Sequence, residues 1–178
     1  VLGKTGRGSH EHFGVAGRDV DIWMGTLSKT LASCGGYIAG DRALVELLKY
    51  AASGFVYSVG ISPVLAAASL KALQIMRREP ERVHTLQERG SQFLNSMRSM
   101  GINTGFAEGY AVIPAITGSS LKAVKLSGQL FDAGLNVQPI IHPAVEEKAA
   151  RLRFFLSSTH SQDDIDLACE TVHTLMKK

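Results

Sequence analysis

The stretch "MGTLSKTLASCGGYIAG", Met24–Gly40, places a single lysine, Lys29, between hydroxyl side chains and a glycine-rich exit. A lysine that forms a Schiff base must lie partly desolvated, so that its amine can lose its proton. Hydroxyl groups on the same tight turn, here those of Thr26 and Ser28, are suitable donors to the phosphate of a cofactor. The spacing alone leaves two interpretations open, a pyridoxal phosphate (PLP) site and a solvent-facing lysine in a polar loop.

Short strands and helices are expected on both sides of Lys29. Residues 19–24 alternate in hydrophobicity as a strand does, and residues 35–40 are bounded by glycine on both sides. Asp41 is placed to cap a helix, and Ser62-Pro63 is a typical helix start. The pattern predicts strands over 19–24 and 35–40, a helix after Asp41, a loop over 55–62 and a helix from Pro63 to about Arg78.

The composition changes after Arg78. Residues 79–101 are highly charged with one apolar face, and Gly101 ends the helix that they predict. The remaining pattern predicts strands over 110–116, 135–139 and 151–156, a helix over 119–133 and a last helix with a Ser161–Asp164 capping box. Because strands and helices mingle throughout, we expect an α/β fold made of residues 1–79 and an α+β domain over residues 80–178.

The overall composition argues against several classes of protein. The 178 residues are 45% hydrophobic and carry a net charge of +3, with Lys and Arg scattered along the chain. A nucleic-acid groove needs concentrated basic residues and a membrane span needs a long apolar run, so we expect neither. Cys34 and Cys169 lie far apart and form no CxxC motif, which favours free thiols in a reducing compartment, the cytoplasm.

Two further motifs near the first residues favour a polar loop. Gly3-Lys4-Thr5 matches only the end of a phosphate-binding Walker A loop, and the residues after it lack the apolar pattern of the helix that should follow. His10 and His12 could contribute to a metal site, but no third ligand stands at a useful spacing. We therefore expect no metal here.

Three segments occur in an order that points to one family. They are "VDIWMGTLSKTLASCGGYIAG", "FVYSVGISP" and "ARLRFFLSSTH". Over essentially its whole length, the chain resembles the C-terminal half of an α-oxoamine synthase. The resemblance implies a fold-type I PLP enzyme that works as a homodimer and joins an amino acid to an acyl thioester, usually with loss of carbon dioxide. Residues 1–79 would end the PLP-binding large domain, and residues 80–178 would form the small C-terminal domain.

The resemblance also implies roles for the residues around Lys29. Lys29 matches the lysine that holds PLP as a Schiff base and then moves the proton at Cα of the amino acid. Thr26 matches a residue that contacts the cofactor phosphate, and Ser28 is a second hydroxyl beside it. Val59 stands where relatives often offer a hydroxyl to the neighbouring subunit's phosphate, and Ser58 is the adjacent candidate.

The same resemblance assigns Arg153 to the substrate. This residue, the second arginine of "RLR", matches the arginine that receives the substrate carboxylate, for which a planar bidentate guanidinium is suited. Without the family, an arginine in a surface ion pair at a strand edge would be the simpler interpretation. Residues 143–145 read Pro-Ala-Val where relatives commonly have Pro-Thr-Val, which removes one hydroxyl that contacts the substrate.

The resemblance leaves other groups of the site outside the sequence. The aspartate that pairs with the pyridine nitrogen, the histidine that stacks on the ring and the glycine-rich phosphate loop belong to the part before Val1. We therefore expect residues 1–178 alone to bind PLP poorly. Two alternatives stay open: an aminotransferase of the same PLP fold, and an α/β interaction module without catalytic activity.

Overall fold

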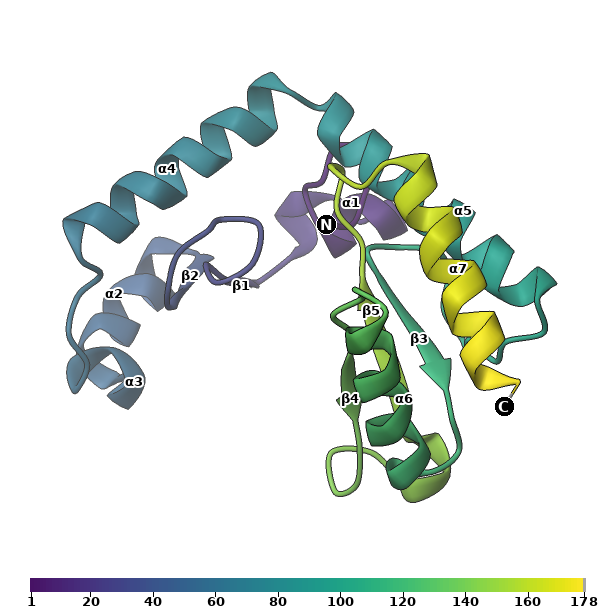
Figure 1. Ribbon diagram of the computed structural model, residues 1–178. Coiled ribbons are helices and arrows are strands. Elements are labelled where there is room, and N and C mark those ends of the chain that lie inside the picture. The colour runs from purple at the N-terminus through teal and green to yellow at the C-terminus, as the bar shows by residue number, and fades with distance from the viewer. Residues whose placement is uncertain (178) are drawn as a thin grey trace. The chain divides into compact units, whose positions relative to one another are not determined.

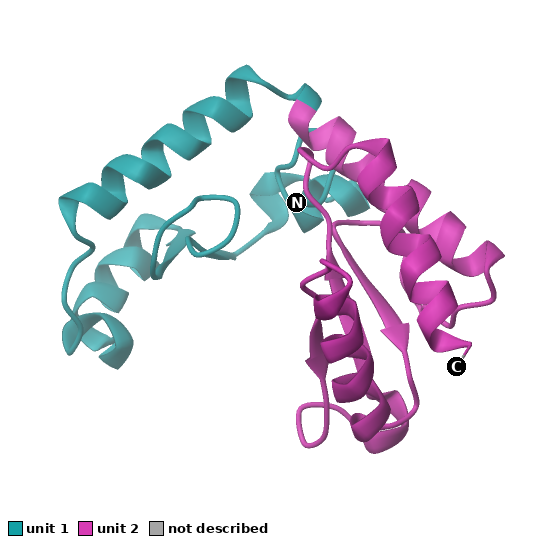
Figure 2. Cartoon of the chain, viewed as in Figure 1, with its two compact units in different colours: residues 1–81 teal, residues 82–178 magenta. Residues whose placement is uncertain are grey.

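The computed structural model describes residues 1–177, and the chain divides into two compact units. Residues 1–81 form the first unit and residues 82–178 the second (Figure 2). Both units contain helices and strands (Figure 1). The predicted mixture of strands and helices is therefore present.

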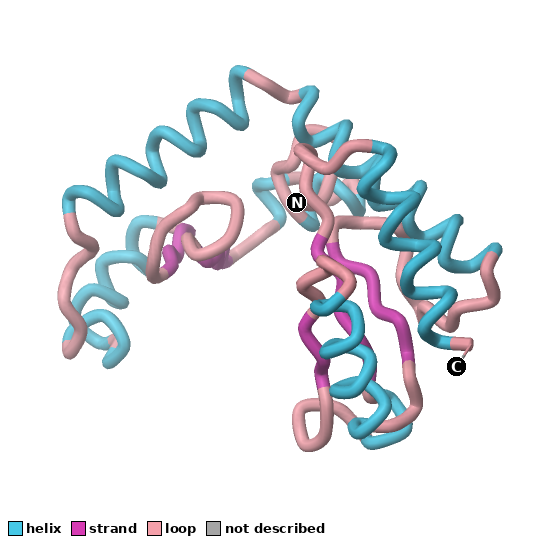
Figure 3. The backbone as a smooth tube through the Cα atoms, in the orientation of Figure 1, coloured by secondary structure: helices cyan, strands magenta, loops and turns pink. Residues whose placement is uncertain are grey.

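The first unit contains one antiparallel pair of strands. β1 (Ile22–Thr26) pairs with β2 (Gly36–Gly40), and Thr26 lies opposite Gly36 (Figure 3). A Cβ atom on Gly36 would lie 2.8 Å from the carbonyl oxygen of Gly25, so a larger residue would push the strands apart. The other elements are α1 (Ser9–Phe13), the 3-10 turn η1 (Gly17–Asp19), α2 (Arg42–Ala51), α3 (Ser53–Val56) and α4 (Pro63–Arg78).

Two predictions for this unit need correction. The strand expected over 19–24 lies over 22–26, because the chain first makes the 3-10 turn η1 and then follows its register with β2. The loop expected over 55–62 begins inside α3, since residues 53–56 form one helical turn. Both errors lie at element boundaries, where hydrogen bonds outweigh local hydrophobic pattern.

The helix starts of this unit were easier to predict. The Ser62 hydroxyl accepts a hydrogen bond from the Leu65 N–H at 3.4 Å, and Pro63 occupies the first turn of α4. Asp41 stands at the start of α2 as expected, although its side chain makes no capping hydrogen bond. Proline at the first helical position fixes φ without losing a hydrogen bond that the helix would have made.

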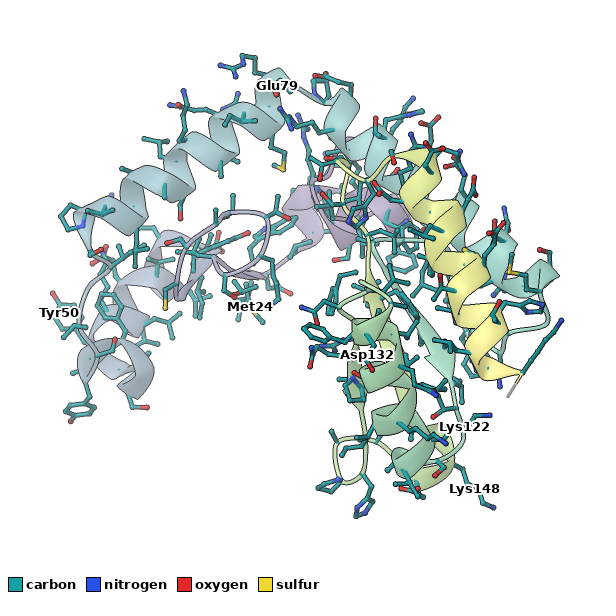
Figure 4. The ribbon with its side chains drawn as sticks, viewed as in Figure 1. Met24, Tyr50, Glu79, Lys122, Asp132 and Lys148 are labelled. Carbon is teal, nitrogen blue, oxygen red and sulfur yellow. The ribbon has the colours of Figure 1, made fainter. Side chains whose placement is uncertain are left out.

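The first unit has no fully buried apolar side chain, although several are half-buried. Within residues 1–81, Gly3 is the one residue classed as buried. Large side chains such as Met24, 78% exposed, and Tyr50, 82% exposed, extend away from the ribbon (Figure 4). A set of side chains without a common core gains little from the hydrophobic effect. This unit therefore needs further protein surface to become stable.

The second unit is organised on a three-stranded antiparallel sheet. Its strand order is β3 (Val112–Ile116), β5 (Arg151–Phe155) and β4 (Gln138–Ile140). Leu152 and Phe154 of the central strand are buried, whereas Arg153 and Phe155 alternate to the other face. One face of the sheet thus lies in the core and the other lies open.

Three helices pack against the buried face. They are α5 (Glu81–Ser99), α6 (Ser120–Asp132) and α7 (Gln162–Met176). Phe93 of α5 lies 5.1 Å from Phe154, measured between ring centroids. The core also includes Leu94, Met97, Ile113, Ala115, Leu126, Leu130, Leu152, Ile165, Cys169 and Val172. In contrast to the first unit, this one encloses a core of its own.

The predicted elements of the second unit form with shifted ends. The strand expected over 135–139 is found at 138–140, after Gly134 turns the chain with φ of 86°. The strand expected over 110–116 begins at Val112. The capping box is confirmed, since Ser161 accepts from the Asp164 N–H and Asp164 accepts from the Ser161 N–H.

Two helical glycines should respond to alanine in opposite ways. A Cβ atom on Gly90 in α5 would lie 2.3 Å from the carbonyl oxygen of Gly109, a backbone atom that cannot swing away. Gly90→Ala should therefore lower the free energy of unfolding by about 1–3 kcal/mol. Nothing lies within 4 Å of such an atom on Gly128 in α6, so Gly128→Ala should raise it by about 0.5–1 kcal/mol. Urea unfolding of both variants measures this, and a stabilised Gly90→Ala protein would contradict the packing.

Candidate functional site

The turn that carries Lys29 begins where β1 ends. The hydroxyl oxygens of Thr26 and Ser28 lie 2.8 Å apart, and the Ser28 N–H donates to the Thr26 hydroxyl at 3.2 Å. The Thr26 hydroxyl also reaches the carbonyl oxygen of Gly35 at 3.3 Å. The turn is closed by a hydrogen bond from the Leu27 N–H to that carbonyl at 2.9 Å. Two hydroxyl groups are thus held together next to Lys29.

Lys29 itself is exposed, as are Thr26 and Ser28. Among the residues that the structure describes, no carboxylate forms an ion pair with Lys29. The partial desolvation expected for a Schiff-base lysine is therefore not supplied by residues 1–177. Further surface would have to cover this turn to provide it.

An apolar groove lies beside the hydroxyl pair within the first unit. It has a volume of about 580 Å³ and is lined by β1, β2, α2 and α3. Met24, Ile38 and Leu48 contribute apolar walls, and Thr26 reaches its lining. Lys49 also lines the groove, but its amine is paired with Glu46 at 2.8 Å. The groove therefore places a polar turn next to an apolar surface.

Ser58 lies apart from this hydrogen-bonded turn. It is exposed in the irregular segment after α3, and its hydroxyl donates to the Phe55 carbonyl at 3.3 Å. No hydrogen bond within residues 1–177 joins Ser58 to the Lys29 turn. Val59 beside it is 94% exposed. Both side chains are thus exposed at the surface of this unit.

Arg153 lies on the open face of the sheet in the second unit. Its Cζ atom stands 4.8 Å from the centroid of the Phe155 ring. Arg151, on the same face, donates from Nε to the Ala149 carbonyl at 2.7 Å. Arg153 forms no ion pair with any described residue. Arg151 uses its Nε–H in its bond to the Ala149 carbonyl, whereas no described residue accepts a hydrogen bond from the Arg153 guanidinium.

A carboxylate fixes the segment that leads into β5. Glu147, in the 3-10 turn η2 (Glu147–Ala149), accepts from the Ser120 N–H at 2.7 Å and from the Ser120 hydroxyl. The His142 N–H donates to the same hydroxyl at 3.2 Å. The hydrogen bonds from the side chain and backbone of Ser120 lower the pKa of Glu147. Segment 142–147 is thereby held at both ends beside the start of α6.

Several of these contacts join residues far apart in the sequence. Ser33 donates from its hydroxyl to the Leu65 carbonyl at 3.1 Å, which connects the Lys29 loop to α4. Glu147 and Ser120, which share hydrogen bonds, are also far apart in the sequence, and no local pattern predicts either contact. The alternation of "RLRFF" does place Arg153 and Phe155 on one face, and it could have predicted their proximity.

Two features are absent from the described part of the chain. Residues 1–177 hold no group of three or more His, Cys, Asp and Glu side chains arranged to bind a metal. In that same range, every helix is too short or too polar to cross a membrane. The candidate groups are therefore Lys29 with its hydroxyl neighbours in the first unit and, separately, Arg153 in the second.

The family model for aminotransferases of class I and II matches residues 3–172. The chain belongs to this family. It is 43% identical to the 8-amino-7-oxononanoate synthase of Symbiobacterium thermophilum, over 94% of the chain and 42% of that relative. It is 37% identical to the serine palmitoyltransferase of Bacteroides thetaiotaomicron, over 96% of the chain and 43% of that relative. The chain thus spans less than half the length of these curated relatives.

Solved structures share the fold of the chain. The serine palmitoyltransferase of Sphingomonas wittichii matches it with a TM-score of 0.89 at 24% identity, over 99% of this chain and 44% of that one. The 8-amino-7-oxononanoate synthase of Francisella tularensis matches with a TM-score of 0.86 at 23% identity, over 99% of this chain and 52% of that one. The resemblance to the α-oxoamine synthases and the fold-type I α/β architecture are both confirmed.

The hydrogen bonds between Ser120 and Glu147 should make the free energy of unfolding depend on pH. The pKa of Glu147 is lower in the folded protein than in the unfolded chain, where it is about 4.3. The contribution of Glu147 to the free energy of unfolding is therefore complete above the unfolded pKa and is lost as pH falls through the folded pKa. Glu147→Gln should therefore be less stable than the wild type at pH 7, and the difference should shrink toward pH 3. Urea unfolding across this range measures the difference.

The neighbouring carboxylate provides the control for this measurement. The side chain of Glu146 makes no capping hydrogen bond at η2, so Glu146→Gln should unfold like the wild type at both ends of the range. A Glu147→Gln difference that is as large at pH 3 as at pH 7 would show that ionisation of Glu147 is not what holds the segment.

Proposed function

We propose that this chain is part of a PLP-dependent α-oxoamine synthase, an acyltransferase that condenses an amino acid with an acyl thioester. The observation that carries the proposal is the Lys29 turn, in which a primary amine follows two hydroxyl groups 2.8 Å apart. The named relatives support it, since they are 8-amino-7-oxononanoate synthases and serine palmitoyltransferases.

The residues of the turn fit the proposed cofactor. The aldehyde of PLP reacts with an amine, and Lys29 offers one that no carboxylate among the described residues pairs with. The phosphate of PLP requires hydrogen-bond donors, and the hydroxyls of Thr26 and Ser28 are suitable donors. Lys29 would hold PLP, and the two hydroxyls would bind its phosphate. Ser58 would serve the phosphate of a neighbouring subunit. When bound, PLP supplies an electron sink for the negative charge that develops at Cα of the amino acid.

Side chains of this chain would carry out the proton transfer and bind the substrate carboxylate. Nζ of Lys29 would remove and return the proton at Cα. Arg153 would hold the carboxylate of the amino acid through two parallel N–H donors. The reaction forms a bond from Cα to the acyl carbon, and it breaks the thioester bond and the bond from Cα to the carboxylate. One amino acid, one acyl thioester and one proton thereby give one α-oxoamine, one carbon dioxide and one free thiol.

The exposed surface of the first unit supports an assembled enzyme. The apolar side chains of residues 1–81 and the exposed Lys29 turn both need covering before a desolvated site can form. We assign this unit to the large PLP-binding domain and the second unit to the small C-terminal domain of a homodimer. Cys34 and Cys169 form no disulfide, which fits our assignment of the protein to the cytoplasm.

A second activity is favoured by the family itself, whose description names aminotransferases. An aminotransferase would use Lys29 and Arg153 in the same roles but would release a 2-oxoacid. The two activities therefore differ in their products and not in the residues of this chain. A third possibility, an interaction module, would use neither residue.

A product assay should separate these activities. The whole protein that contains this chain, supplied with PLP, is incubated with glycine, L-alanine or L-serine and an acyl-CoA. Palmitoyl-CoA is one donor, as one relative's name indicates, and pimeloyl-CoA is another, because its seven carbons and the two that alanine keeps make an oxononanoate. Free CoA and carbon dioxide released together are expected. A 2-oxoacid formed without CoA would identify an aminotransferase instead.

Loss of the Lys29 amine should abolish turnover. Lys29→Ala should lower kcat by roughly 10²- to 10⁴-fold, the usual contribution of a positioned acid–base group. Lys71, an exposed lysine on α4, provides the matched control, and Lys71→Ala should keep wild-type activity. Equal activity of the two variants in the CoA-release assay would exclude Lys29 from the reaction.

A further inference from the structure

We propose that Phe155 is a positioning residue that orients the Arg153 guanidinium for the substrate carboxylate. The inference rests on the proposed role of Arg153. Both residues lie on β5, two positions apart and on the open face of the sheet. The Cζ atom of Arg153 stands 4.8 Å over the Phe155 ring, within the range of a cation–π contact.

A ring face supports an arginine without using its hydrogen-bond donors. The five N–H groups of a guanidinium lie in its plane, whereas an aromatic ring attracts the cation through the electrons above its face. A carboxylate partner would occupy those donors and neutralise the charge. Contact with Phe155 thus restrains the long side chain of Arg153 and leaves its N–H groups available for a bidentate carboxylate.

The neighbours of Arg153 across the sheet supply no competing anion. Arg153 lies opposite Pro114 on β3 and Gln138 on β4. Pro114 offers no side-chain hydrogen bond, and the Gln138 amide donates to Asn136 at 2.8 Å. The charge of Arg153 is therefore supported by Phe155 and by no ion pair among the residues described.

The surroundings of Phe155 explain why this position is suited to the role. Val112 lies directly opposite Phe155 on β3, and both are partly exposed, Phe155 by 56% and Val112 by 45%. The pair forms an apolar surface on the same face as the guanidinium. Arg151, also on this face, is instead held by the Ala149 carbonyl, so it is anchored to the backbone. Phe155 thus contacts the arginine of this face that no described hydrogen bond anchors.

The test measures amino-acid binding separately from turnover. Dissociation constants of glycine, L-alanine and L-serine are measured by calorimetry on the whole PLP-loaded protein without an acyl donor. Phe155→Leu, which removes the ring but keeps apolar bulk, should weaken binding roughly 2- to 30-fold, the range that a cation–π contact supports. Phe155→Tyr keeps the ring and should restore wild-type binding. The KM for the acyl thioester should not change in either variant.

A double-mutant cycle distinguishes positioning from a merely structural effect. In an Arg153→Lys background, Phe155→Leu should have little further effect on amino-acid binding, because the planar guanidinium that it orients is gone. Phe131→Leu provides the control, since Phe131 is an exposed aromatic residue on α6 at 67% exposure. It should bind amino acids like the wild type.

The outcomes separate this inference from the proposed function. Weaker binding in Phe155→Leu, rescued by Phe155→Tyr and dependent on Arg153, supports the positioning role even if no CoA is released. Wild-type binding in Phe155→Leu overturns the role, whatever the product assay gives. Additive effects of the two substitutions overturn it as well, and so does a wild-type protein that binds none of the three amino acids.

Discussion

The pleat of β5 is the constraint on which the exposure of Arg153 depends. Because side chains alternate along a strand, the burial of Leu152 and Phe154 against the helices forces Arg153 and Phe155 onto the opposite face. A shift of one residue in the register would expose the core and bury the guanidinium. The charge of Arg153 is therefore held in place by the same hydrophobic packing that stabilises the second unit.

The Lys29 turn of the first unit depends on a different condition, the removal of water from around the lysine amine. Its strand pair and the hydrogen bonds of Thr26 define the Lys29 turn locally, but almost no side chain of this unit is buried. A lysine in water stays protonated, and a Schiff base requires the neutral amine. The geometry of the turn thus comes from this chain, whereas the desolvation that the proposed role of Lys29 requires would come from additional protein surface. The two requirements are physically separate.

The limits of sequence-based prediction follow from which contacts are local. The capping box at Ser161 and the alternation of residues 151–155 depend on neighbours in sequence, and both were predicted. The start of β1 was misplaced because its ladder with β2 sets the register, and the turn α3 carried no distinct pattern. The spacing nominated Lys29, and only the family resemblance nominated Arg153. The exposure of Lys29 and the ring beneath Arg153 depend on three-dimensional surroundings, which neither argument could give.

We propose that Lys29 is the residue that carries PLP in this protein. A direct test is to incubate the whole protein with PLP, reduce it with borohydride and map the modified peptides by mass spectrometry. A pyridoxyl group is expected on the peptide that contains Lys29, between Thr26 and Gly35 in the turn after β1. A protein that remains unlabelled, or that carries the label on another lysine, would contradict it.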